Sequence, residues 1–190
     1  MAAACECWDS QTAACVWQAR FRVRLAATGI LTLTSPVTSS VPAGPCAGAG
    51  AREVAMPVIV VTRLRLKDPA VLDEFFASAV AVVEQAQNSE GNLGADVLAE
   101  ANNTYWTRTA WKERGLMHAF VGSEPHLNTM GRLDGWCDEA TFVDWEQASA
   151  GLPDWQEGYG HLIANGQVAS LTNATDAHHT RDFPAPIVSS

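Results

Sequence analysis

Two histidines, His118 and His126, are the side chains of this sequence best suited to proton transfer near neutral pH. Trp106, Arg108 and Trp111 precede them in a stretch that reads as a strand. An oxygenase that works without a cofactor must turn its substrate into an electron-rich anion that can pass an electron to dioxygen. A histidine would be the base, Arg108 or an indole N–H would hold the anion, and apolar side chains would exclude water. We therefore predict His126, His118 and Arg108 as catalytic residues.

The apolar wall of such a site would come from large side chains near the histidines and in the last helix. Trp106 and Trp111 are an odd number of positions apart, so they face opposite sides of one strand and only one of them can face a given pocket. Arg108 shares the face of Trp106. The predicted substrate-binding residues are Trp106, Trp111, Phe120, Met130 and Tyr159.

Each candidate also has an ordinary structural interpretation that the sequence leaves open. His126 could contact solvent or a helix cap, and His118 could lie on the surface. Trp111 and Tyr159 could be core residues, and Arg108 could form a cross-strand ion pair. The acids between Asp138 and Glu146 are interpreted as a solvated strand edge.

Hydrophobic periodicity predicts the elements that would position these residues. Val60, Thr62, Leu64 and Leu66 alternate on one face of a strand, and Asp68-Pro69 is typical of a helix start. The predicted strands are 58–66, 95–100, 105–111 and 141–145, and the predicted helices are 69–88, 113–121, a short one after Ser123, and one from Leu152-Pro153 to Gly166.

This order predicts an α+β fold of ferredoxin-like type, with a four-stranded antiparallel sheet and helices on one face. The other face would be apolar and bare, so we expect a symmetric homodimer that covers it. The domain is predicted to span 56–166. Residues 1–55 are interpreted as a disordered low-complexity leader or an over-extended start, and 167–190 as a flexible tail.

Three stretches carry a resemblance to a known family: Tyr105–Trp111, Met117–Phe120 and Gly122–His126. Together they resemble a strand and the helix that follows it in antibiotic-biosynthesis-monooxygenase-type domains, over residues 57–165. The resemblance implies a dimeric α/β barrel. It also implies oxidation of a small aromatic or polycyclic molecule, with no metal, flavin or other cofactor.

Two other functions stay open. The same dimer could bind a small molecule or act as a scaffold without turnover, since a fold does not fix a function. It could also bind haem, because the superfamily includes haem-degrading enzymes. The resemblance to those enzymes implies a site of Asn, Trp and His. At the three corresponding positions this sequence has Thr62, Phe120 and Met130 instead.

Composition narrows the classes of partner. Residues 56–190 hold 8 basic and 18 acidic side chains, a balance that repels nucleic acid and anionic membranes. No stretch reaches the ~20 apolar residues of a membrane span.

Cys137 is the one cysteine after residue 55, and neither Cys5-x-Cys7 nor His178-His179 has the other ligands of a metal site. We expect a cytoplasmic protein that binds no metal.

Overall fold

The structure is a computed structural model that describes residues 56–188. The proposed leader, residues 1–55, lies outside this range. The elements in chain order are β1 (Val58–Leu66), the 3-10 helix η1 (Pro69–Val71), α2 (Leu72–Asn88), β2 (Asn92–Glu100), β3 (Thr104–Trp111), α3 (Arg114–Val121), α4 (His126–Met130), α5 (Leu133–Trp136), β4 (Cys137–Glu146), α6 (Trp155–Asn165), β5 (Gln167–Val168) and α7 (Asp176–Thr180).

The strands form one antiparallel sheet in the order β2-β3-β1-β4-β5, which confirms the predicted α+β class. The four predicted strands are present, and the short β5 pairs with Thr141 and Phe142 as a fifth. β4 begins at Cys137 rather than Thr141 because its first residues pair with the end of β1, where Leu66 lies opposite Cys137.

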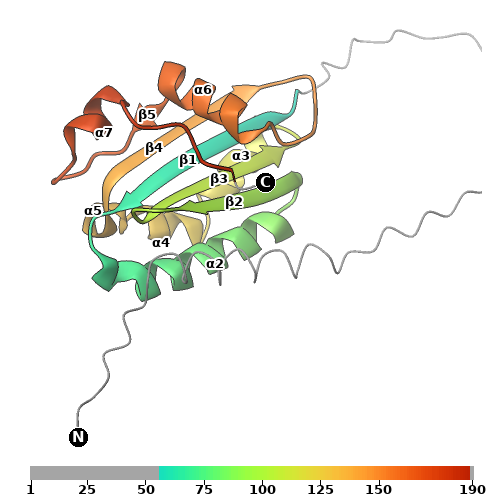
Figure 1. The fold of residues 1–190 in the computed structure, drawn as a ribbon. Helices are drawn as coiled ribbons and strands as arrows, with labels where there is room; N and C mark the ends of the chain where they lie inside the picture. Colours follow the sequence, from blue (N-terminus) through green and yellow to red (C-terminus); the bar gives the residue numbers. More distant parts are fainter. Residues whose placement is uncertain (1–55, 189–190) are drawn as a thin grey trace, which may run out of the picture.

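Helices α2 to α5 cover one face of the sheet, called here the first face (Figure 1). Helix α2 follows the 3-10 helix η1, whose N-cap Asp68 accepts the Ala70 N–H at 2.8 Å. It buries Phe75 and Val83, and α3 buries Phe120 beside it. These side chains pack on the alternate residues of β1 and β3 that face them, so this layer is a conventional sheet–helix core.

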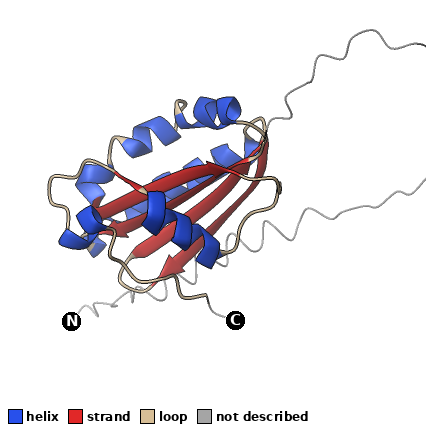
Figure 2. Ribbon diagram, turned by 90° about the horizontal axis from the view of Figure 1, so that it is seen from above, coloured by secondary structure: helices blue, strands red, loops and turns tan. Residues whose placement is uncertain are grey.

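The opposite, second face of the sheet is also covered. Helix α6 packs Trp155 and Leu162 against Ile59 and Val61 of β1. The chain then crosses this face toward β2, so that helices lie on both sides of the strands (Figures 1 and 2). The prediction of helices on one face thus gives only part of the architecture, because the amphipathic pattern of α6 shows that it is buried but not against which face.

Residues 167–188 pack on the sheet, in contrast to the flexible tail expected from their polar sequence. His178 is 1% exposed. Its Nδ1 accepts the Ala140 N–H at 3.2 Å, and its Nε2 contacts the Ala169 carbonyl at 3.0 Å. Phe183 is buried near Trp106, with ring centroids 6.3 Å apart. We call residues 167–188 the C-terminal strap.

This cover bears on the predicted homodimer. The bare apolar face on which that prediction depends is occupied by α6 and the C-terminal strap of the same chain. Pairing two copies through this face would require the strap or α6 to move. No helix among residues 56–188 has the length and apolar character needed to cross a bilayer.

Candidate functional site

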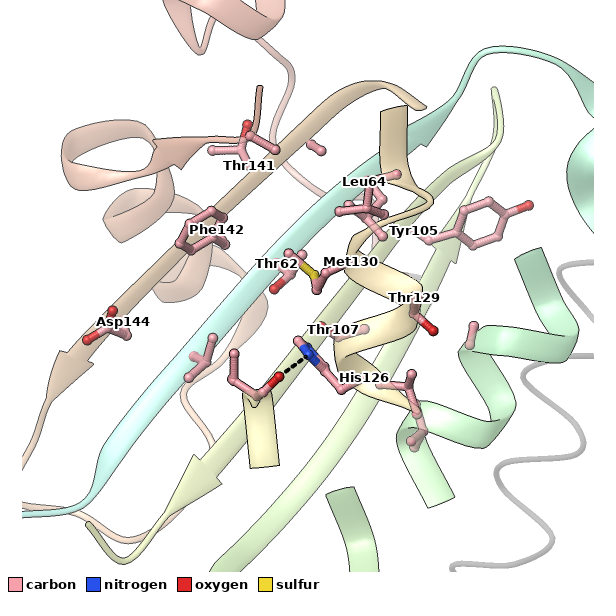
Figure 3. Close-up of a pocket in the computed structure, with 18 of the residues that line it drawn as sticks. Thr62, Leu64, Tyr105, Thr107, His126, Thr129, Met130, Thr141, Phe142 and Asp144 are labelled. Carbon is pink, nitrogen blue, oxygen red and sulfur yellow. Dashed lines mark hydrogen bonds between the residues drawn. The ribbon is translucent and has the colours of Figure 1, made fainter. Parts of the chain in front are cut away.

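A cavity of about 300 Å³ lies between the first face of the sheet and helices α2 to α5. Strands β1, β3 and β4 form its floor with residues such as Val60, Tyr105 and Phe142 (Figure 3). Helices α2, α3 and α4 supply the opposite wall, including Val83 and Met117. Its size and its largely apolar wall suit a small organic molecule.

His126 is the best-placed base in this cavity. Its Nδ1 lies 3.2 Å from the Val121 carbonyl oxygen (Figure 3). A carbonyl can only accept a hydrogen bond, so in the neutral ring Nδ1 carries the proton and Nε2 keeps its lone pair. Burial lowers the pKa of His126 below its usual 6.5, against the smaller raising effect of the Val121 bond. The imidazole is therefore neutral at pH 7, as a general base must be.

Gln85 on α2 fixes the backbone around His126. Its Oε1 accepts the His126 N–H at 3.0 Å. Its Nε2 donates to Ser123 Oγ at 2.7 Å and to the Phe120 carbonyl at 3.3 Å. One side chain thus joins α2 to both ends of the α3–α4 connection.

His118 and Met130 also line the cavity, so the structure brings both predicted histidines to one place. His118 lies on the exposed side of α3, and Met130 is 39% exposed. Asp144 lines the cavity as well, and its carboxylate is paired with Arg114. In the described part of the chain, no lysine or arginine lines this cavity.

Two threonines on the cavity floor were missed as site residues. Thr62 on β1 and Thr107 on β3 are direct cross-strand partners, and both line the cavity (Figure 3). Within residues 56–188 neither hydroxyl has a hydrogen-bond partner, so both can serve a ligand oxygen. Sequence alternation placed Thr62 with Val60 and Leu64, but only the β1–β3 register places Thr107 beside it.

Three predicted site residues lie away from the cavity, on the second face of the sheet. The Arg108 guanidinium binds Asp96 at 2.6 Å and lies 4.1 Å from the centre of the Trp155 ring. Trp106 and Tyr159 both belong to the core that α6 makes with the sheet. Alternation along β3 explains this, because positions 106 and 108 point opposite to 105 and 107. Arg108 thus has the ion pair that was the other interpretation of its sequence position.

Trp111 and Phe120 lie on the cavity side and stack on each other, with ring centroids 4.9 Å apart. They line a smaller space of about 80 Å³ next to the main cavity. The Phe120 ring also contacts the His126 ring, at 4.7 Å between centroids. Among residues 56–188 no three His, Cys, Asp or Glu side chains are grouped as they would be to hold a metal ion.

Comparisons with known proteins give structural likenesses only. No protein-family model matches the chain, and no curated protein matches it significantly. SnoaB, a cofactor-independent oxygenase from Streptomyces nogalater, is 17% identical over 53% of this chain and 100% of its own, with a TM-score of 0.43. A candidate antibiotic biosynthesis monooxygenase from Nitrosomonas europaea is 18% identical over 49% of this chain and 91% of its own, with a TM-score of 0.44. The chain is similar in three dimensions to both proteins. The second of them is described as belonging to the family that the sequence resembles.

Proposed function

We propose that this protein is a monooxygenase-like enzyme that oxidises a small aromatic or polycyclic molecule without a metal or organic cofactor. The observation that carries the proposal is His126, a neutral histidine whose Nδ1 is held by a carbonyl and whose ring borders an apolar cavity. A base of this kind in a water-poor space can generate a reactive carbanion or phenolate.

In the proposed reaction, Nε2 of His126 takes a proton from a CH₂ group that is acidified by a neighbouring aromatic ring and carbonyl. The negative charge spreads to the carbonyl oxygen, where the hydroxyls of Thr62 and Thr107 can donate hydrogen bonds. The anion passes an electron to dioxygen, and the two radicals combine into a peroxide. Protonation by the imidazolium and loss of water then leave a carbonyl, so CH₂ and O₂ become C=O and H₂O.

The cavity's charge supports a neutral substrate. No cation lines it within the described residues, and Asp144 adds negative charge that Arg114 offsets. A carboxylate or phosphate on the substrate would enter without a charged partner. The hydroxyl pair on the floor would instead orient a phenol or ketone oxygen.

The proposed site needs one chain, since β1, β3, β4 and helices α2 to α5 together supply its walls. The homodimer therefore stays a separate proposal, to be measured by sedimentation. Non-catalytic binding of the same kind of molecule is the second candidate, because the apolar wall alone would support affinity.

Oxygen uptake with anthrone- and quinol-type substrates tests the activity. We expect His126→Ala to abolish uptake and His118→Ala to reduce it. His179→Ala, which removes an exposed side chain of α7 that does not line the cavity, is the matched control. Tight binding of the substrate without uptake would favour the non-catalytic candidate.

Uptake that is unchanged in the double variant of His118 and His126 would contradict the catalytic assignment. A Soret band on adding haemin that is lost in His126→Ala would favour haem binding.

A further inference from the structure

A second cavity, of about 80 Å³, lies beside the main one, between α2, α3 and strands β2 and β3. Both cavities are bordered by His126, Met117 and Val83, so the smaller one is a side chamber of the site. The walls that belong to the chamber alone include Ala86 and Trp111, which are 2% and 0% exposed. The chamber is therefore an interior space next to the proposed base.

The polar groups that border this chamber and not the main cavity already have partners, whereas the free hydroxyls of Thr62 and Thr107 lie on the boundary that the two cavities share. The Trp111 indole N–H donates to Thr109 Oγ1 at 2.9 Å. Asp96 accepts from the Val97 N–H at 2.9 Å and from Arg108 at 2.6 Å. A water molecule needs two to four polar partners to be held in a buried space, and apolar cavities without them stay dry.

The size of the chamber also limits its occupant. An apolar protein cavity of about 150 Å³ binds benzene or xenon. A space of roughly half that volume admits a diatomic gas but no substituted aromatic ring. The aromatic substrate therefore belongs in the main cavity, and the chamber suits a small, uncharged, apolar molecule.

We propose that the side chamber bordered by Ala86, Trp111 and Phe120 is a binding site for dioxygen. The inference rests on the proposed function, since only an oxygen-consuming reaction gives the site a role. His126 borders both compartments, so gas held in the chamber would lie next to the carbon that His126 deprotonates. Dioxygen held there would already be beside the substrate when the anion forms.

Xenon and dioxygen, used as probes on the intact chain, test the site without any turnover. Methyl-resolved NMR under xenon pressure should shift the signals of Ala86, Ala95 and Val97, and dissolved dioxygen should broaden the same signals. Shifts confined to the main cavity, at Ala79 and Leu64, or no shifts at all, would overturn the proposal.

Two alanines on α2 offer a matched pair of variants. Ala86→Leu should fill the chamber and abolish the xenon shifts there, while binding of the aromatic substrate persists. Ala79 lines only the main cavity, so Ala79→Leu should weaken binding of the aromatic substrate and leave the xenon shifts in the chamber unchanged. Should Ala86→Leu fail to fold, Ala95→Val narrows the chamber from the β2 side with a smaller added volume.

Kinetics separate this inference from the proposed function. If the protein oxidises a substrate, Ala86→Leu should raise the KM for dioxygen and leave the KM for the aromatic substrate in place. An unchanged KM for dioxygen in a folded Ala86→Leu variant would overturn the dioxygen site while the activity stands. If xenon and dioxygen affect the Ala86 signal but the protein takes up no oxygen, the gas-binding site is supported and the proposed activity is overturned.

Discussion

The Oε1 of Gln85 accepts the backbone N–H of His126 at 3.0 Å, so a half-buried residue near the C-terminal end of α2 holds the first turn of α4. The amide group of Gln85 is used at both ends, because its Nε2 donates to Ser123 Oγ and to the Phe120 carbonyl. Gln85 contacts the backbone of His126 and not its ring, which makes it a positioning residue for the base.

Gln85→Met tests that role, since methionine has a similar shape and neither hydrogen-bonding group. We expect it to loosen the α3–α4 connection, move the pKa of His126 toward its usual value and lower oxygen uptake more than substrate binding. An NMR pH titration of the His126 ring measures the first effect. Gln87→Met, exposed on the same helix, is the control. A titration of His126 that is the same in Gln85→Met and in the natural protein would contradict the role.

The lowered pKa of His126 makes a prediction about stability. The unfolded chain takes up a proton near pH 6.5, whereas the folded chain does so only at lower pH. The neutral ring's contribution to the free energy of unfolding is thus complete above 6.5 and is lost as pH falls through the window below it. Urea unfolding at about pH 5 and about pH 7.5 should show this slope, and His126→Gln should reduce it. An equal slope in His126→Gln would contradict the assignment.

Phe183 tests whether the C-terminal strap contributes to the core. Its ring is 4% exposed and lies 4.1 Å from the Arg63 guanidinium carbon. Phe183→Ala should lower the free energy of unfolding by about 3–5 kcal/mol, the usual cost of such a truncation in a core. Ile187→Ala, in the same segment but 77% exposed, should change it by less than about 0.5 kcal/mol. Equal effects of the two variants would show that the strap does not pack on the sheet in solution.

A buried ion pair joins β1 and β4 on the second face, between Arg63 and Glu139, whose side chains are 4% and 2% exposed. Thr175 Oγ1 also donates to Glu139, at 2.9 Å. Glu139→Ala should cost about 3–5 kcal/mol because it leaves the Arg63 charge buried without its partner. The double variant with Met at both positions should recover much of this loss. Chemical unfolding of Arg63→Met, Glu139→Met and the double variant measures the coupling, and simple additivity would contradict it.

Local patterns in the sequence were sufficient to predict four of the five strands and the faces of β1 and β3. Alternation along β1 separated Val60 and Thr62 from Val61 and Arg63, and the odd spacing of Trp106 and Trp111 placed them on opposite faces, as the structure confirms. Both signals depend on neighbours within one strand, which is why they could be read without the fold.

The contacts that complete the fold could not be predicted in this way, since they join distant segments. Glu139 was interpreted as a solvated acid, yet its partner Arg63 lies 76 positions away in the chain. His178 and Phe183 stand in a polar stretch with no periodicity, and their burial follows from where the strap crosses the sheet. The cavity shows the same limit, because the Thr62–Thr107 pair exists only through the register of β1 and β3.

The C-terminal strap ends beside β2, where the Ile187 N–H donates to Glu100 Oε1 at 2.6 Å, on the sheet face turned away from the cavity (Figure 1). A fluorophore or a surface linker attached at the exposed Ile187 would lie on the opposite side of the sheet from the cavity. A biosensor immobilised through Ile187 would therefore leave the cavity side of the sheet uncovered.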